Sequence, residues 1–557
     1  MTKGSYLEIS VNKRQERDSK LFPEWLIPED KLPGADVKNV LAWPVTSGFL
    51  SLEEIEITES SARFILESIK NRKWTAYQVA LAFCHRASIA HQLVNCLSEV
   101  FFAEGLAQAK ELDAYYEETG ELKGPMHGLP ISLKDNLNVI GQQTTLGFAG
   151  FCNNPEKFTY DSSLVSILRR MGAVFCFKTN VPTAMMMPET INHVFGETSN
   201  PFNRNLTCGG SSGGESALGA LLGNCYLGIG SDIGGSLRIP ASMQNLFTLR
   251  PTFGRFPTFG ARSGLPGLES VNSVNGPIST NLDNLEFYCK TVVNEGKPWM
   301  HDPKCYEIPW KEVTLPKKLT FAVMKDDGYV KPYPGVVRGL ESVISKLEKE
   351  GHEVIEWNPL NHDRLNEILL QMFVSDGGIH CKEYAGLTDE PFFPYMEPYG
   401  TVKEMGVSEL WDLQSERTML CKQYLEAWNT TASKTKSGEP IDAILLPVTP
   451  YSGAKKGTFR YCGYTSVFNA LDWPAGVVPV TTADKTVDSK PDCYVPRNEM
   501  DKTTFDEFDP DMVDGGPVSI QVVCKKAQDE KVVSLMRHIS EIIGTINYWT
   551  TKSALKD

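Results

Sequence analysis

Residues 207–240 read TCGGSSGGESALGALLGNCYLGIGSDIGGSLRIP and contain two serine clusters, each flanked by glycines. The apolar run between the clusters predicts a helix from about Gly214, followed by a short buried strand over 226–230 that leads into the second cluster. Glycine beside a hydroxyl residue permits tight or positive-φ turns in which successive N–H groups point together at an anion. Such converging N–H groups stabilise the oxyanion of an acyl-transfer reaction.

A lone lysine ends a short apolar run upstream, in the sequence ISLKDN at 131–136. A serine is a weak nucleophile at its free pKa and needs an adjacent base. Lysine can act as that base only when it is neutral, which requires burial or nearby positive charge to lower its pKa. The apolar residues before Lys134 favour such burial, so the serine clusters and this lysine together indicate acyl transfer without histidine.

Three other interpretations of the serine motifs compete with this one. GSSGG at 210–214 formally matches a G-x-S-x-G nucleophile elbow, but residues 199–205 form a turn-rich run in place of the strand that an elbow needs. No Gly-Lys-Ser/Thr follows, which excludes a Walker-type phosphate loop. His127 and His193 leave a Ser-His-Asp arrangement open, because a triad is recognised by geometry, and a structural role is the alternative for both.

Composition limits the classes of function. The chain has 557 residues and a net charge of -14, and its Lys and Arg residues are scattered, which argues against a nucleic-acid partner. Thirteen cysteines form an odd number without metal-ligand spacing, so we expect neither a disulfide framework nor a metal site. The N-terminus has no apolar signal region, and no run of about 18 apolar residues occurs, so we expect a cytoplasmic protein without an integral membrane segment.

Helices and short apolar strands alternate along most of the chain, which predicts an α/β fold layered around a mixed or parallel sheet. Thr75 with Gln78 forms a capping box that predicts the start of a helix. The acidic, Pro-rich stretch 482–516 predicts an exposed loop. We expect an irregular N-terminal segment (1–57) and one catalytic domain (58–557), the latter with a helical layer (58–120), a core that carries the serine motifs (121–300) and a helical lobe (381–440).

Six motifs follow one another along the chain: GPMHGLPISLKD (124–135), KTN (178–180), CGGSSGGE (208–215), DIGGSLRIP (232–240), LRPTFGR (249–255) and, more weakly, PAG (474–476). In this order they resemble the amidase signature family. The stretch 247–279 is most similar to fungal acetamidase-type amidases. The resemblance implies an α/β/α sandwich around a mixed β-sheet.

The resemblance also implies a Ser-Ser-Lys triad. Ser236 would be the acyl nucleophile, Lys134 the base, and Ser211 the bridge between them, placed after a cis peptide bond. The reaction would need no metal or cofactor. The oxyanion would bind to the backbone amides of a short run, namely Ile233, Gly234, Gly235 and Ser236.

One departure from the family pattern concerns the serine spacing. Ser211 and Ser236 are one residue further apart than is usual in the family, so counting back from Ser236 reaches Ser212. The local frame CGGSSGG at 208–214 nevertheless selects Ser211, and the extra residue fits best within 222–226. Ser212 is then expected to be a supporting hydroxyl.

The implied reaction is the hydrolysis of a small-molecule linear carboxylic amide, acetamide-like or another monocarboxylic primary amide, to carboxylate and ammonia. Three methionines after KTNVP resemble the part of the family that lines the acyl pocket, and their flexible thioethers suit varied apolar groups, with core packing as the alternative: Met185, Met186 and Met187.

Three other functions of the amidase fold stay open. They are a fatty-acid amide hydrolase, the amidase subunit of a tRNA-dependent amidotransferase, and a non-catalytic scaffold. The acidic composition disfavours the amidotransferase subunit, and the presence of Lys134, Ser211 and Ser236 disfavours the scaffold. The oligomeric state, a homodimer included, is left open.

Overall fold

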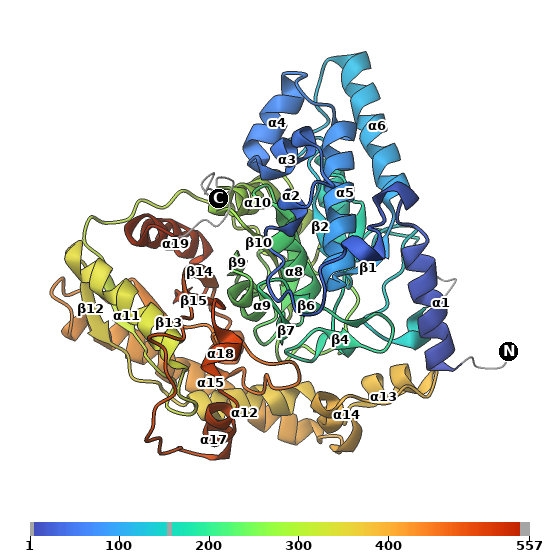
Figure 1. Ribbon diagram of the computed structural model, residues 1–557. Coiled ribbons are helices and arrows are strands. Elements are labelled where there is room, and N and C mark those ends of the chain that lie inside the picture. The colour runs from blue at the N-terminus through green and yellow to red at the C-terminus, as the bar shows by residue number, and fades with distance from the viewer. Residues whose placement is uncertain (1–4, 153–158, 546–557) are drawn as a thin grey trace.

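The computed structural model describes residues 5–152 and 159–545. An 11-stranded sheet runs through the molecule (Figure 1). From one edge to the other its strands are β1 (Leu97–Val100), β3 (Phe177–Thr179), β2 (Ser132–Lys134), β8 (Leu227–Asp232), β10 (Val274–Ser279), β9 (Phe247–Arg250), β14 (Ala475–Thr482), β15 (Pro517–Val523), β13 (Ala443–Pro447), β11 (Thr320–Val323) and β12 (Glu353–Glu356). Strand β2 pairs in parallel with both neighbours, whereas β9, β10, β14 and β15 pair antiparallel. The sheet is mixed, which confirms the predicted fold class.

Alternate side chains of β11 enter two different hydrophobic cores. Phe321 and Val323 belong to one core and Ala322 to the other, as the period of two in a strand requires. The first core also holds side chains of α5 (Ala76–Val94), α6 (Phe102–Thr119), α7 (Ser163–Arg170), α10 (Leu282–Asn294), α11 (Pro334–Lys349) and α19 (Asp529–Ile543). The second core holds side chains of α12 (His362–Phe373), α13 (Ile379–Gly386), α15 (Val407–Thr430) and α16 (Gly463–Leu471).

The elements around the serine motifs form where they were predicted. The capping box is present at the start of α5, where Thr75 Oγ1 accepts from Gln78 N at 3.0 Å and Gln78 Oε1 accepts from Thr75 N at 2.9 Å. The predicted helix between the serine clusters is α8 (Gly213–Leu222), and the predicted strand is β8. Helices α13 and α15 occupy much of 381–440, while the predicted domain boundaries stay predictions.

The prediction of an irregular segment over 1–57 is wrong in part, because the segment contains helix α1 (Tyr6–Asp18) and most of helix α3 (Leu52–Glu59). The buried side of α1 is polar and includes Lys13, whose Nζ lies 2.7 Å from Glu99 Oε1. Tyr6 and Ile9 pack against a small apolar cluster, but the fully buried positions of this helix are polar or charged. It therefore lacks the hydrophobic periodicity by which sequence reasoning identifies a helix.

The stretch 482–516, predicted as an exposed loop, contains the short helices α17 (Glu499–Asp506) and α18 (Pro510–Val513). Asn498 and Asp509 each accept a backbone N–H of the first turn that follows them. Such side-chain caps start a short helix without an apolar pattern, which is why composition alone pointed to a loop.

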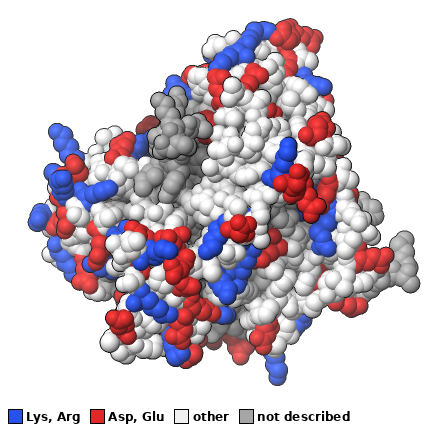
Figure 2. All heavy atoms as spheres, viewed as in Figure 1, with Lys and Arg blue, Asp and Glu red and all other residues white. Residues whose placement is uncertain are grey.

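Charges of both signs are intermixed on the face of the molecule shown in Figure 2. This agrees with the scattered Lys and Arg residues of the sequence, and the absence of a nucleic-acid partner stays a prediction. Within residues 5–152 and 159–545, no helix is long and apolar enough to cross a membrane.

Candidate active site

Lys134 and Asp232 end two neighbouring strands. Strands β2 and β8 pair in parallel, with Leu133 opposite Ile229, so their carboxyl ends meet at one edge of the sheet. The loop 233–237 follows β8 and leads into α9 (Arg238–Met243). The sheet therefore brings the lysine of one motif beside the second serine cluster.

Hydroxyl groups hold Lys134. Its Nζ donates to Ser211 Oγ at 2.8 Å and to Ser231 Oγ at 2.8 Å. The lysine is fully buried, and Ser211 is buried as well. The Gly210–Ser211 peptide bond is cis, as the family resemblance implies. Ser211 thus lies in direct contact with the lysine, where the bridge of the triad is expected.

Burial lowers the pKa of Lys134 to about 7, against the attraction of Asp232, Glu215 and Asp135. Each of these carboxylates is engaged elsewhere. Asp232 pairs with Arg238 at 3.0 Å, Glu215 accepts from three hydroxyl groups, and Asp135 accepts from two hydroxyls and two backbone N–H groups. Among the described residues no carboxylate forms an ion pair with Lys134, which favours the neutral amine.

Ser212 has different contacts from Ser211. Its hydroxyl donates to Ser231 O at 3.2 Å, and its backbone N–H donates to Ser236 O at 3.1 Å. It therefore ties the end of β8 to the loop of the second serine cluster. These contacts favour Ser211 as the bridge to Lys134 and Ser212 as a supporting hydroxyl.

Asp232 shapes the loop that carries Ser236. Its Oδ1 accepts from Gly235 N at 2.8 Å. Burial favours the neutral acid, but the Arg238 guanidinium lowers the pKa of Asp232 to about 2. The Gly235 N–H is therefore already bound to a carboxylate, whereas the family resemblance implied it as one of four oxyanion donors. Within the described part of the chain, no group accepts from the other three N–H groups, those of Ile233, Gly234 and Ser236.

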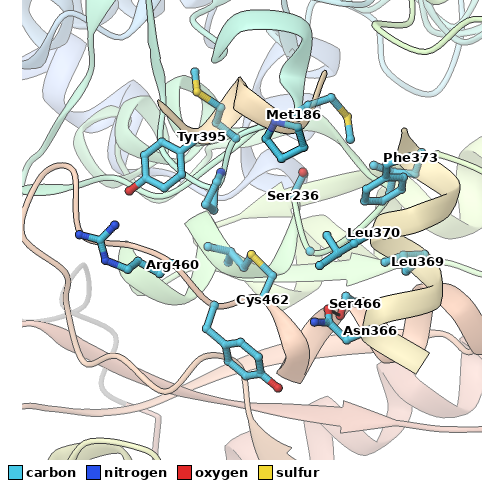
Figure 3. Close-up of a pocket in the computed structure, with 18 of the residues that line it drawn as sticks. Met186, Ser236, Asn366, Leu369, Leu370, Phe373, Tyr395, Arg460, Cys462 and Ser466 are labelled. Atoms are coloured by element: carbon cyan, nitrogen blue, oxygen red, sulfur yellow. Dashed lines mark hydrogen bonds between the residues drawn. The ribbon is translucent and has the colours of Figure 1, made fainter. Parts of the chain in front are cut away.

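A cavity of about 670 Å³ lies beside the half-buried Ser236 (Figure 3). The loop residues Ile233, Gly234 and Gly235 line it together with Ser236. Met185 lines it too, with the two methionines that follow. The methionines expected in the acyl pocket thus face the same cavity as the candidate nucleophile, and Met185 also packs against the second core.

Much of the cavity wall comes from helices that sequence reasoning did not connect with the serine motifs. Helix α12 contributes one face and α16 another, with Asn366, Leu369, Leu370, Phe373, Cys462 and Ser466 among the residues that line the cavity. The spacing of the α12 residues by three and four positions is typical of one helical face. This spacing could have predicted the helix. No local sequence signal, however, shows that this face of α12 lines the same cavity as the loop 233–237.

The two candidate histidines lie away from the cavity. His127 Nδ1 accepts from Lys123 N at 3.0 Å, and His193 Nε2 donates to Pro391 O at 3.0 Å. Neither lines the cavity beside Ser236. The geometry therefore gives the Ser-His-Asp alternative no support, and both histidines have structural contacts.

A family model described as Amidase matches residues 78–533. The chain belongs to the amidase signature family. It is 38% identical to an acetamidase of Aspergillus oryzae over 556 residues, covering 98% of this chain and 100% of that protein. An acetamidase of Emericella nidulans is 37% identical over 552 residues, covering 97% and 99%. As a member of this family the protein is an amide-hydrolysing enzyme.

A solved structure of the same family has a very similar fold. It is a fatty acid amide hydrolase with a TM-score of 0.91 and 32% sequence identity, and the match covers 97% of this chain and 96% of that chain. The amidase signature architecture thus extends over almost the whole chain, including the helices that line the cavity.

Proposed function

We propose that this amidase hydrolyses linear monocarboxylic primary amides to carboxylate and ammonia through an acyl-enzyme on Ser236. Lys134 is the base and Ser211 relays the proton. The observation that carries the proposal is the 2.8 Å contact between Lys134 Nζ and Ser211 Oγ, made by a buried lysine whose pKa is lowered to about 7. The similarity to two fungal acetamidases supports the substrate class.

In the proposed reaction, neutral Lys134 takes a proton from Ser211 as Ser211 takes one from Ser236. The Ser236 oxygen then bonds to the amide carbonyl carbon, and the C=O electron pair moves onto the oxygen. Collapse of this intermediate breaks the C–N bond, and the relayed proton leaves with ammonia. Water then attacks the ester by the same relay, which releases the carboxylate and restores Ser236.

The free N–H groups of Ile233, Gly234 and Ser236 would stabilise the developing oxyanion. Removing one such donor costs about 3 kcal/mol of transition-state stabilisation in comparable enzymes. The Gly235 N–H has a different role in this proposal, because it holds the Asp232 carboxylate that orders the loop.

The cavity favours a second candidate, a fatty-acid amide hydrolase. Its volume of about 670 Å³ lies within the range of sites that bind drug-sized ligands and exceeds what acetamide needs. Met185, Leu369 and Phe373 give it an apolar lining suited to a longer acyl chain. The similarity to a fatty acid amide hydrolase supports this alternative.

The test is ammonia release from a series of primary amides, from acetamide to long-chain amides, by the wild-type enzyme and Ser236→Ala. We expect release from the short amides and its loss in the variant. A preference for long chains would instead favour the fatty-acid amide hydrolase. Release from none of the amides would overturn the proposal and favour an amidotransferase subunit or a non-catalytic scaffold.

A further inference from the structure

Two polar side chains from different helices meet in the wall of the cavity. The hydroxyl of Ser466 on α16 donates to Asn366 Oδ1 on α12 at 2.6 Å. Both residues line the cavity that contains Ser236, and Figure 3 shows them next to each other, near Leu369 and Leu370. Ser466 is buried and Asn366 is half-buried, so the pair is accessible mainly from the cavity.

This hydrogen bond determines which part of the Asn366 amide is available to a ligand. Its oxygen accepts from Ser466, so the NH₂ group has two N–H donors left. Within residues 5–152 and 159–545, no group accepts from Nδ2. An N–H donor in an apolar wall loses solvation unless a ligand or a water accepts from it. A ligand atom placed here gains most if it is a hydrogen-bond acceptor.

The pair lies close to the proposed reaction centre. Thr465, the residue before Ser466, donates its hydroxyl to Gly234 O at 2.8 Å. This contact fixes α16 against the loop of the second serine cluster. Asn366 and Ser236 line the same cavity, so an acyl chain attached at Ser236 extends into the space that the Asn366 amide faces.

The charges around the pair select a neutral acceptor. Asp363 on the same helix also lines the cavity, has no ion-pair partner among the described residues, and would repel an anionic chain. The two arginines of the cavity wall do not offset it, because Arg364 pairs with Glu416 at 2.6 Å and with Glu367 at 2.7 Å, and Arg460 pairs with Glu507 at 2.7 Å. An uncharged oxygen avoids this repulsion and still accepts from Asn366.

We propose that Asn366, oriented by Ser466, is a substrate-binding residue that donates a hydrogen bond to a neutral acceptor oxygen on the acyl chain. The inference rests on the proposed amidase function and sharpens it. Favoured substrates are primary amides whose acyl chain carries a hydroxyl, ether or carbonyl oxygen. The apolar residues around the pair hold the carbon chain, and Asn366 selects its substituent.

The test compares hexanamide with its 3-, 4-, 5- and 6-hydroxy derivatives. We expect one isomer to exceed hexanamide in kcat/KM by about 3- to 10-fold, the range of one neutral hydrogen bond. The same isomer should bind more tightly to Ser236→Ala, whose Kd is measured by calorimetry without turnover. In Asn366→Leu the preference should fall to about 1-fold, because the donor is gone.

Two further variants separate binding from folding. Asn366→Asp can still accept from Ser466 but has no N–H donor, so its preference should move from the hydroxyl isomer to the matching amino isomer. Ser466→Ala removes the orienting hydroxyl, so the preference should be reduced but not reversed. Thermal unfolding of each variant identifies any loss that comes from the fold.

The outcomes that overturn the subsite differ from those that overturn the proposed function. An unchanged preference in Asn366→Leu, or no isomer that exceeds hexanamide in kcat/KM or in binding, overturns the role of Asn366. A wild-type enzyme that releases no ammonia from any primary amide, from acetamide to the long-chain amides, overturns the proposed function instead. In that case the Kd series with Ser236→Ala still decides whether Asn366 binds the acceptor.

Discussion

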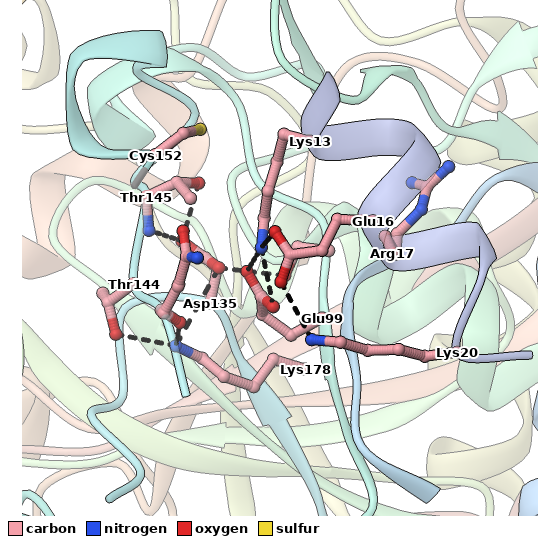
Figure 4. A network of polar contacts seen from close by, with 12 residues as sticks. Lys13, Glu16, Arg17, Lys20, Glu99, Asp135, Thr144, Thr145, Cys152 and Lys178 are labelled. Atoms are coloured by element: carbon pink, nitrogen blue, oxygen red, sulfur yellow. Dashed lines mark hydrogen bonds and ion pairs between the residues drawn. The ribbon is translucent and has the colours of Figure 1, made fainter. Parts of the chain in front are cut away.

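Two buried lysines of this amidase have opposite surroundings. Lys13 on α1 lies 2.7 Å from Glu99 and 3.2 Å from Glu16 (Figure 4). Lys134 donates to two hydroxyls and a backbone carbonyl instead. Burial is the largest influence on both lysines and acts to lower both pKa values. For Lys13 the charges and hydrogen bonds of Glu99 and Glu16 together outweigh burial and raise the pKa, whereas burial lowers the pKa of Lys134 to about 7.

Both lysines are buried, so burial alone does not explain why their pKa values shift in opposite directions. The difference is that Lys13 directly contacts carboxylates and Lys134 does not. Lys178 is an intermediate case in the same network. Its Nζ lies 3.9 Å from Asp135 Oδ1, and burial lowers its pKa to about 8. Asp135 follows Lys134 in the chain but directs its carboxylate at Lys178 and at other donors. Three carboxylates therefore lie near Lys134, but none of the described residues forms an ion pair with it.

Among substitutions that test the difference between the two lysines, we expect Lys134→Ala to have the largest effect, a fall in kcat/KM. Loss of a general base lowers a rate by about 10²- to 10⁴-fold, so kcat/KM at neutral pH should fall by about that factor. Wild-type kcat/KM should rise with pH through about 7, because the neutral form of Lys134 is the proposed base. The variant should lack this step and recover some activity at higher pH. Steady-state rates of both proteins across this pH range, with one primary amide, provide the measurement.

The matched control for this variant is Lys134→Arg. It keeps a long cationic side chain, but a guanidinium does not lose its proton in a protein. It should therefore be about as inactive as Lys134→Ala at every pH. A wild-type rate in Lys134→Ala would eliminate the relay, and so would an active Lys134→Arg enzyme.

The next largest effect is expected from Lys13→Met, which should lower the free energy of unfolding. Removing one partner of a buried ion pair costs about 3–5 kcal/mol, because Glu99 stays behind with an uncompensated charge. The free energy of unfolding in urea should fall by about that amount. The midpoint of the pH–rate profile should not move, because the charges that act on Lys134 are Asp232, Glu215 and Asp135.

The double variant Lys13→Met with Glu99→Gln serves as its control. It removes both charges, so much of the lost stability should return. If the pH–rate profile of Lys13→Met moved along the pH axis, the two lysines would be electrostatically coupled. The pKa of Lys134 would then depend on Lys13, contrary to the comparison above.

The sequence could predict the parts of this comparison that depend on local pattern. A short apolar run placed Lys134 at the end of a buried strand, and glycines placed Ser211 and Ser236 in turns beside helix and strand ends. The buried Lys13 could not be predicted in this way. Its helix has a polar buried side, and its partner Glu99 belongs to a strand far along the chain.

In the active site, too, the sequence predicted residues within a recognisable local pattern but not those that the fold brings together from distant elements. Met185 was predicted from the resemblance of its stretch to the part of the family that lines the acyl pocket, and it lines the cavity. Asn366 and Ser466 were not predicted, because each lies in a helix whose pattern describes only its own face. The same holds for the N–H of Gly235, since only the fold shows that Asp232 has already bound it.

The smallest effect is expected from Ser231→Ala. A hydrogen bond to the charged form of a lysine raises its pKa, so removing the Ser231 hydroxyl at 2.8 Å should lower the pKa of Lys134 further. One such bond contributes about 0.5–1.5 kcal/mol, and one pKa unit corresponds to about 1.4 kcal/mol. The midpoint of the pH–rate profile should therefore move down by about 0.5–1 unit. The profile of kcat/KM against pH measures this shift directly.

Ser212→Ala is the matched control, because the Ser212 hydroxyl bonds the backbone oxygen of Ser231 and does not reach the lysine. Its midpoint should stay at the wild-type pH even if its rate falls. An upward shift in Ser231→Ala would mean that this hydroxyl donates to the neutral amine and does not accept from the ammonium. Lys134 would then be kept neutral by a specific donor as well as by burial, which is a stronger contrast with Lys13 than burial alone provides.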